Sequence, residues 1–377
     1  MRRARLRGQL LAGHRAPHPG PIATRDAGPA GDAAVEAVAG VVGTLVGVQA
    51  QEATAAALAV RARSRGLVAA DVDRARHERK VVLTWSLRGT RHLHRADDVR
   101  PMLALLGPTF LRPSRRAEEL GIAGAAGERA VRVLRRALAD DGPLTRDEVK
   151  ARLAPHGVDP SGQAAIHVIG RAALEGLLCV LPGERYLLLD DWLGPPDAAA
   201  AVDRDRDRDR AAGELARRYL SAFAPATPAD FAAWSGLGLP VARRAWATID
   251  ADLVEVESPA GTSWLLASDV DRARAAAGRS RRSTGVRLLG AFDSLLLAYA
   301  DRRLHLSADH APLVNRGGGM VKPLLVVDGR VAGTWSRPWG RVEVHPFRPL
   351  TGDVSAAVER EAADVVRFLR TGPNPRS

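Results

Sequence analysis

The sequence predicts an α+β protein in which three tandem winged-helix domains are followed by a C-terminal β-barrel-like domain. The first observation behind this prediction is a unit of helices followed by a strand pair, which recurs about every eighty to one hundred residues. The second is a change of the hydrophobic pattern to a period of two beyond residue 279. The predicted boundaries are an N-terminal segment over 1–30, winged helices over 31–120, 121–200 and 201–278, and a β-rich domain over 279–377.

The first unit has the full pattern of a winged helix. Apolar residues at helical spacing predict three helices, and Arg88-Gly89 provides the turn between two strands. The predicted order is helices over 33–46, 51–63 and 71–79, then strands over 81–87 and 90–93. A fold of this kind usually places its third helix in the major groove of DNA and its hairpin, or wing, near the backbone.

The same order returns twice. In the second unit an apolar helix is followed by a helix capped by Thr145 and by a third helix over 161–178, which leads into a hairpin. In the third unit the segment around Thr227 aligns with that around Thr145, and strands are predicted over 253–256 and 263–266. This repetition predicts stacked similar units rather than one large core.

A charged segment and a β-rich segment lie between and beyond these units. Asp203 to Arg210 alternates Asp with Arg, which predicts a solvated linker or a frayed helix start. In the C-terminal domain Asp328-Gly329 predicts a hairpin turn. The expected elements there are strands over 304–306, 324–327, 331–335 and 342–344 and a helix over 354–369.

The composition indicates a polyanionic partner in a reducing compartment. The formal net charge is +12, and arginine carries nearly all the positive charge, because lysine occurs only at positions 80, 150 and 322. Each phosphate that a cation neutralises releases counterions, so nucleic acid is the first candidate, and a biased genome is the alternative explanation. Cys179 is the single cysteine, which argues against a disulfide framework or a thiolate metal site.

Several kinds of site and segment are not indicated by the sequence. No apolar run has the length of a signal peptide or a membrane span, so we expect a cytoplasmic protein with no membrane partner. Gly-rich phosphate loops, His-Glu metal pairs and nucleophile elbows are not found either. We therefore expect a monomer with no cofactor and no metal, and on these patterns alone a transcription regulator is favoured.

Basic and polar residues on the predicted wings, helices and loops are the candidate DNA contacts. They are Arg88, Arg91, His92 and His94 of the first wing, Gln163 and Arg171 of the second unit, Arg281 and Arg282 at a domain boundary, and His310 and Arg316 of a C-terminal loop. His167 shares a helical face with Gln163 and Arg171, but its apolar neighbours predict a core position. The alternative is that some of these faces bury contacts between units.

Gln49-Ala50-Gln51 lies at the break between the first two predicted helices, within the segment Gly47-Val48-Gln49-Ala50-Gln51-Glu52. This segment resembles the Gln-aliphatic-Gln signature of the winged-helix DNA glycosylases typified by AlkZ, whose relative YcaQ has Asp at the second polar position. The likeness extends over nearly the whole chain. It includes residues 84–93, 162–177, 229–237 and Phe292-Asp293.

The resemblance implies a C-shaped molecule whose basic concave surface holds double-stranded DNA carrying alkylated guanine. Family members are similar in removing bulky alkylated guanines, including the unhooking of interstrand crosslinks, and many protect producers of DNA-alkylating natural products. By match to the family's motif, Gln49 would position the attacking water, and Gln51 would orient the sugar, the water or a phosphate. The Gly-rich loop over 315–319 would either approach the lesion or be a plain flexible hairpin.

Two neutral amides suffice only for a particular kind of lesion. Alkylation at N7 makes guanine cationic, so the leaving base is already activated and no strong general acid is required. An amide carbonyl and NH₂ can then position a water and stabilise an oxocarbenium-like sugar. We therefore expect a monofunctional DNA glycosylase that ignores unmodified guanine, without lyase activity, because the lysines are scattered.

Two functions of other classes remain open. A non-catalytic winged-helix transcription regulator would prefer one unmodified sequence, whereas an architectural protein would bind DNA generally. In either, Gln49 and Gln51 would cap a helix start and contact phosphate. Base release from a duplex that carries a cationic alkylguanine distinguishes the enzyme from both.

Overall fold

The computed structural model describes residues 1–12, 29–196, 206–257, 261–278, 285–315, 317 and 319–370. Three of the expected DNA contacts, Arg281, Arg282 and Arg316, lie outside the described residues. The start of the Asp-Arg alternation lies outside them as well, and its later residues begin helix α11 (Arg206–Phe223).

The first unit has the predicted order of helices and hairpin. Its elements are α2 (Pro29–Thr44), β1 (Val48–Gln49), α3 (Ala53–Arg63), α4 (Ala69–His77), β2 (Val81–Trp85), β3 (Arg91–Arg95) and α5 (Ala96–Phe110). Val35, Val38 and Val42 bury one face of α2 because they recur at helical spacing. The 3₁₀ turn Leu87–Gly89 joins β2 to β3 where the sequence predicted the wing's turn.

The second unit is built in the same way. Its elements are α6 (Arg115–Glu119), α7 (Gly124–Asp141), β4 (Leu144–Thr145), α8 (Arg146–Leu153), α9 (Ala164–Leu174), β5 (Leu178–Leu181), β6 (Arg185–Leu188) and α10 (Leu189–Leu193). The predicted cap of α8 is confirmed: Thr145 Oγ1 accepts from the Glu148 N–H, and Glu148 Oε2 accepts from the Thr145 N–H.

One six-stranded sheet joins the first two units, in the order β1-β3-β2-β5-β6-β4. The junction is short: Leu83 of β2 pairs with Val180 of β5, and Thr84 Oγ1 donates to the Leu178 carbonyl at 3.3 Å. One cluster of buried apolar side chains also extends from Ala34 to Phe368. The expectation of stacked units without a large common core is therefore wrong, because long-range packing unites them.

The third unit consists of α11, α12 (Pro228–Ser235), α13 (Leu239–Ala247), β7 (Leu253–Val256), β8 (Ser263–Leu266) and α14 (Val270–Gly278). Thr227 caps α12 through the Asp230 N–H at 3.0 Å, as the alignment with Thr145 predicted. Tyr219, Phe231 and Trp234 pack their rings together, with centroids 5.0 to 6.0 Å apart. This aromatic cluster fixes α12 against α11.

The C-terminal region contains one antiparallel sheet, in the order β12-β11-β10-β9. Its elements are β9 (Val286–Leu289), α15 (Ser294–Leu297), α16 (Ala311–Val314), β10 (Leu324–Val327), β11 (Arg330–Ser336), β12 (Glu343–Pro346) and α17 (Gly352–Leu369). Within the described ranges β9 and β12 are edge strands, so these strands do not close the expected barrel. The strand expected over 304–306 is instead a turn, in which the His305 and Leu306 N–H groups donate to the Arg302 carbonyl.

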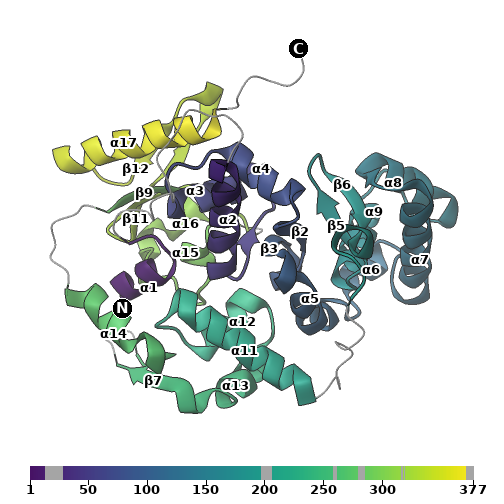
Figure 1. The fold of residues 1–377 in the computed structure, drawn as a ribbon, viewed down its shortest axis with the longest axis horizontal. Coiled ribbons are helices and arrows are strands. Elements are labelled where there is room, and N and C mark those ends of the chain that lie inside the picture. The colour runs from purple at the N-terminus through teal and green to yellow at the C-terminus, as the bar shows by residue number, and fades with distance from the viewer. Residues whose placement is uncertain are drawn as a thin grey trace.

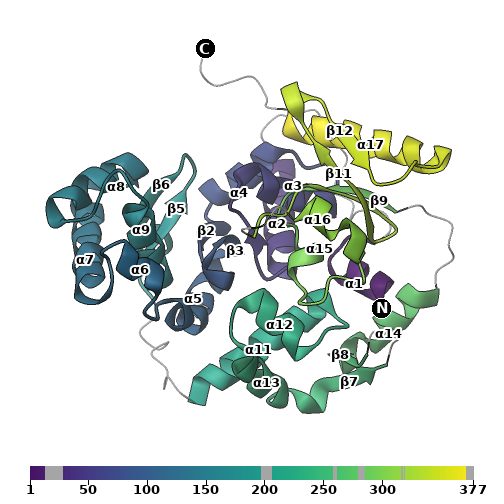
Figure 2. The same cartoon turned by 180° about the vertical axis from the view of Figure 1, so that it is seen from behind.

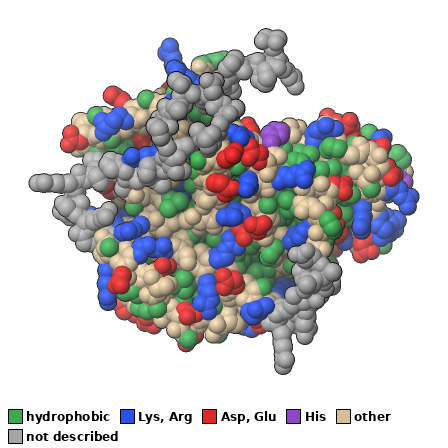
Figure 3. Space-filling model, in the orientation of Figure 1, with side chains coloured by type: hydrophobic (Ala, Val, Ile, Leu, Met, Phe, Trp, Pro, Cys, Tyr) green, Lys and Arg blue, Asp and Glu red, His purple; other side chains and the backbone are tan. Residues whose placement is uncertain are grey.

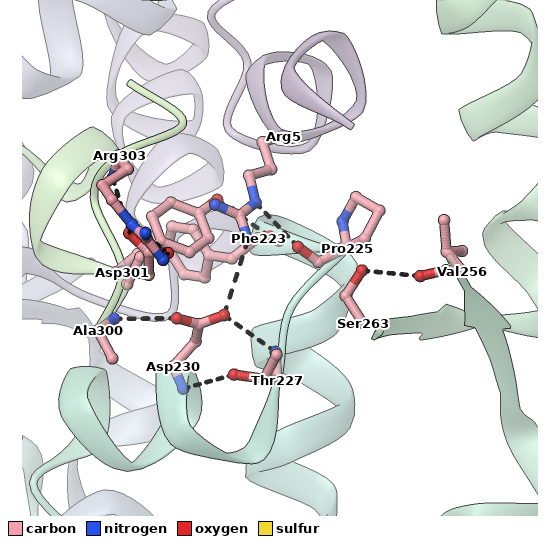
Figure 4. Close-up of polar contacts among 12 residues, drawn as sticks. Arg5, Phe223, Pro225, Thr227, Asp230, Val256, Ser263, Ala300, Asp301 and Arg303 are labelled. Atoms are coloured by element: carbon pink, nitrogen blue, oxygen red, sulfur yellow. Dashed lines mark hydrogen bonds and ion pairs between the residues drawn. The ribbon is translucent and has the colours of Figure 1, made fainter. Parts of the chain in front are cut away.

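Helix α1 (Arg2–Gly8) belongs to the folded core, although the sequence placed 1–30 outside the domains. Arg5 Nε donates to the Pro225 carbonyl at 2.8 Å, and Arg5 Nη2 lies 3.7 Å from Asp230 Oδ2 (Figure 4). Asp230 also accepts from the Ala300 N–H at 2.9 Å. The Arg5 guanidinium lies over the Tyr299 ring. Helix α1 therefore joins the third unit to the C-terminal region.

The four parts are arranged around the centre of the molecule. Helices α7 to α9 form a lobe at one side, whereas α11 to α13 and the C-terminal sheet with α17 surround α2 and α3 from below and above (Figures 1 and 2). Basic and acidic side chains are interspersed over the face in Figure 3. Among the described residues, no helix combines the length and apolar character needed to cross a membrane.

Candidate active site

Gln49 lies at the edge of the six-stranded sheet rather than at a helix start. It is paired with His92, and Val48 is paired with Leu93, so β1 extends the first wing by one short strand. Gly47 makes this approach possible, since its φ is +130° and a Cβ there would lie 2.6 Å from His94 Cε1. Glycine at position 47 therefore places Gln49 directly beside the wing.

Arg88 holds the side chain of Gln49. Arg88 Nη2 donates to Gln49 Oε1 at 2.6 Å, and Arg88 Nη1 donates to the Trp234 carbonyl of the third unit. A guanidinium has no acceptor, so the carbonyl of the Gln49 amide must face Arg88 and its NH₂ must face elsewhere. Burial, together with the nearby charge of Arg302, lowers the pKa of Arg88 to about 10.

Two buried histidines support Arg88 and β1 from inside the wing. His92 Nδ1 lies 3.0 Å from the Thr90 carbonyl, so it carries the ring proton, and His92 Nε2 can accept from Arg88 Nη2 at 3.3 Å. His94 Nε2 lies 2.6 Å from Ser86 Oγ. Burial lowers the pKa of His92 well below its usual value and that of His94 to about 4. Both rings are therefore neutral at pH 7.

A small cavity adjoins Gln49 and Arg88, with about 20 Å³ available to the centre of a water molecule. This volume is enough for about one water. Its walls come from three of the four parts of the molecule. The lining residues are Leu45, Gly47, Val48, Gln49, Ala59, Arg88, His92, Trp234, Ala291, Phe292, Asp293, Ser294 and Leu297.

Asp293 is the acidic residue of this cavity, but its carboxylate is already occupied. Arg63 donates to both carboxylate oxygens at 2.8 Å, and the Leu295 N–H donates to Oδ1 at 2.9 Å. Both side chains of the pair are 0% exposed. All of these donors are protein groups, so the carboxylate serves as the countercharge of the buried Arg63.

Gln51 faces away from this cavity. Alternation along a strand would place residues two apart on the same face, but β1 ends at Gln49, and Gln51 does not line the cavity. Gln51 is exposed, and its Oε1 accepts from the Arg91 N–H at 3.1 Å. Ala50 between them is 3% exposed and donates its N–H to the Arg91 carbonyl, so it packs in the core rather than lining the cavity.

The structure corrects several of the expected DNA contacts. His92 and His94 are 2% and 1% exposed, so neither can reach DNA from the wing surface. Arg88 is committed to Gln49 and Trp234 instead of solvent. His167 is exposed, although its apolar neighbours predicted a core position, because the face it shares with Gln163 points outward.

The other described candidates lie at the surface with partners of their own. Arg91 pairs with Glu184 at 2.6 Å, and Arg171 pairs with Glu175 at 2.9 Å. Gln163 accepts from Arg116, and His310 packs on Phe347 with ring centroids 4.3 Å apart. These residues do not line the cavity beside Gln49.

Sequence reasoning missed Arg302, which lies close enough to Arg88 to lower its pKa. Arg302 is half-buried, and burial lowers its own pKa. Asp301 pairs with Arg303, whereas the Arg302 side chain has no ion pair within the described part of the chain. The only signal in the sequence was its place in Asp301-Arg302-Arg303, which does not tell which arginine is paired.

Comparisons with known proteins agree on one family. The sequence profile described as "DNA glycosylase AlkZ-like" matches residues 42–368. The chain is 31% identical over 347 residues to an "Interstrand DNA cross-link repair glycosylase" of Streptomyces sahachiroi, covering 87% of this chain and 89% of that protein. The structure is similar to that of Streptomyces sahachiroi DNA glycosylase AlkZ, with a TM-score of 0.77, 28% identity, and 97% and 96% of the two chains covered.

Proposed function

The chain belongs to the AlkZ-like family of DNA glycosylases, and we propose that it hydrolyses the N-glycosidic bond of bulky, cationic N7-alkylguanine adducts in duplex DNA. The observation that carries this proposal is the cavity of about 20 Å³ beside the Gln49 amide. It has room for one attacking water and no free carboxylate. Such a site suits a base that is already activated to leave.

Gln49 positions the water in the proposed reaction. Its Oε1 has two lone pairs, of which Arg88 uses one, and its NH₂ group is left to donate. The water attacks the anomeric carbon, the glycosidic electron pair goes to the cationic base, and the water's proton passes to solvent. Neutral alkylguanine leaves, and the sugar becomes an abasic site.

Gln51 and Arg302 hold the DNA in this proposal. Gln51 is exposed beside the wing, where its NH₂ can donate to a phosphate or a sugar oxygen. Arg302 is a cation without a carboxylate partner among the described residues, so a phosphate near the lesion would complete its contacts. The three helical units act as winged helices along the duplex.

We also propose that the enzyme unhooks interstrand crosslinks and gives self-resistance to a DNA-alkylating natural product. The curated relative is named as a cross-link repair glycosylase, which supports the first of these. Lysines 80, 150 and 322 do not line the cavity, so a Schiff-base lyase step is not expected. The enzyme is proposed to act as a monomer in the cytoplasm and to leave an intact abasic site.

Base release from a duplex that carries one cationic N7-alkylguanine tests the proposal. We expect the wild type to release the base and leave a strand that breaks only after hot alkali. Gln49→Ala should slow single-turnover release by about 100-fold, since it loses a positioned water. Thermal unfolding of both proteins checks that the variant is folded. Equal release by wild type and variant, or release of unmodified guanine, would overturn it.

A duplex that carries an interstrand crosslink tests the proposal that the enzyme unhooks such crosslinks. Unhooking converts the slow-migrating crosslinked species into single strands on a denaturing gel. If the protein releases simple N7-alkylguanine but leaves the crosslink intact, the crosslink proposal fails while the glycosylase proposal stands.

A further inference from the structure

The turn between β11 and β12 presents a fully exposed tryptophan. Trp339 is 100% exposed, whereas Trp85, Trp234, Trp246 and Trp335 are each at most 9% exposed. Leaving an indole entirely in water is unfavourable, since burial of a large apolar side chain is favourable. Exposed aromatic side chains of this kind are typical of surfaces that bind a partner.

The backbone holds Trp339 in place. Its φ of 50° lies in the left-handed region, which is strained for a bulky side chain. The Arg341 N–H donates to the Pro338 carbonyl at 2.9 Å, and Arg337 Nε donates to the Gly340 carbonyl at 3.2 Å. The indole is therefore presented by a closed turn rather than by a loose loop.

The charges around the turn favour an anionic partner. Arg337 and Arg341 flank Trp339 and are exposed, and neither forms an ion pair within the described ranges. Between residues 330 and 352, Glu343 is the single acidic residue, against four arginines. A flat apolar ring between two cations suits a nucleic acid, whose bases stack and whose phosphates pair with arginine.

The sheet places this turn at the same end as the candidate active site. Leu324 of β10 pairs with both Leu289 of β9 and Thr334 of β11, so the C-terminal ends of β9 and β11 lie at the same end of the sheet. After Leu289 the chain runs directly into Ala291–Ser294, which line the cavity beside Gln49. Strands β9 and β11 are separated by β10, which puts them roughly 10 Å apart.

We propose that Trp339 is a DNA-contacting wedge, which stacks on a base at a step near the lesion while Arg337 and Arg341 contact the flanking phosphates. This inference rests on the proposed function, because it takes duplex DNA as the partner. Apolar side chains that enter a base step open the duplex locally, which would help a bulky or crosslinked base to reach a fixed water.

Equilibrium binding of the full chain to an alkylguanine duplex tests the wedge, with Gln49→Ala as background so that the substrate stays intact. Adding Trp339→Ala should weaken binding by about tenfold, whereas Trp339→Phe should keep most of it, because phenylalanine still stacks. Val254→Ala, a second exposed apolar residue on β7, is the matched control and should bind normally. The logarithm of the DNA-binding constant falls linearly with the logarithm of the salt concentration. Replacing Arg337 and Arg341 by Gln should reduce the magnitude of this slope by about two, because two phosphate contacts are lost.

Iodide quenching gives a readout that does not depend on activity. Trp339 should account for most of the iodide-sensitive fluorescence, and bound DNA should protect it in the parent but change little in the Trp339→Ala variant. Unaltered binding by Trp339→Ala, or an indole still quenched in the complex, would overturn the wedge. Absence of base release by the wild type would instead overturn the proposed function, which Trp339 does not test.

Discussion

At the scale of single residues, Arg88 decides what the amide of Gln49 can do. The guanidinium accepts nothing, so it selects one of the two amide orientations and holds it at 2.6 Å. The same arginine binds the Trp234 carbonyl, so the orientation of a side chain in the first unit depends on the third. Arg88, expected to contact DNA, is therefore a positioning residue.

Arg88→Met should lower the single-turnover rate of base release by about 100-fold, because the Gln49 amide is no longer held in one orientation. The affinity for DNA should change by less than about threefold, because no surface cation is removed. Arg88→Lys should recover part of the rate, since one donor remains. Parallel rate and binding measurements check this. An equal loss of rate and affinity would show that Arg88 acts mainly on DNA binding.

Asp293 is expected to act on stability rather than on chemistry. Asp293→Asn leaves Arg63 buried without its countercharge, which should lower the free energy of unfolding by about 3 to 5 kcal/mol. Urea unfolding at pH 7 measures the loss. If the variant kept its stability but lost base release, Asp293 and not Gln49 would be the group that handles the water.

At the scale of elements, the β2–β3 hairpin supports the short strand that carries Gln49. The rings of His92 and His94 stack with centroids 5.9 Å apart beneath β1. Gly47 lets β1 approach them, and the turn Leu87–Gly89 projects Arg88 toward α12. The short strand β1 thus depends on the neutrality and the packing of this interior.

The wing should make stability sensitive to acid. Below pH 6.5 the unfolded chain binds a proton at His94, whereas the folded chain binds it only near pH 4. The free energy of unfolding is therefore highest above pH 6.5, where His94 is neutral in both states. It falls by up to about 3 kcal/mol as the pH drops toward 4. Urea unfolding at several pH values in this range gives the free energy of unfolding as a function of pH. This free energy should change less steeply with pH in His94→Gln than in the wild type, and an unchanged pH dependence would contradict the prediction.

At the scale of the whole molecule, contacts between distant segments assemble the cavity. The first unit supplies Gln49 and Arg88, the third supplies Trp234, and the C-terminal region supplies Asp293. Helix α1 holds the last two regions together through Arg5, Asp230 and the Tyr299 ring. Stability and the geometry of the site are therefore linked.

Arg5→Ala should lower the free energy of unfolding by about 3 kcal/mol, since it leaves Asp230 buried without its cation. Arg7→Ala, a change in the same helix at a partly exposed position, is the control and should cost less than about 1 kcal/mol. Thermal and urea unfolding measure both. Equal effects of the two changes would mean that α1 packs without a specific role for Arg5.

The sequence by itself determined the features that depend on nearby residues. Thr145 and Thr227 cap their helices, the hairpin turns at Arg88-Gly89, and strands β7 and β8 cover the residues predicted for them. These follow from backbone preferences and from hydrogen bonds over a few residues. The Gln-Ala-Gln segment could likewise be singled out from its likeness to a family motif.

Only the tertiary structure decided how that segment is used. It merged the hairpins of two units into one sheet, buried His92 and His94, and turned Arg88 from solvent onto Gln49. The merged sheet and the turned arginine depend on groups distant in the sequence, such as Leu83 with Val180 and Gln49 with Arg88, which are 39 residues apart. Local propensity carries no information about such pairs, because their contact is set by the packing of whole units.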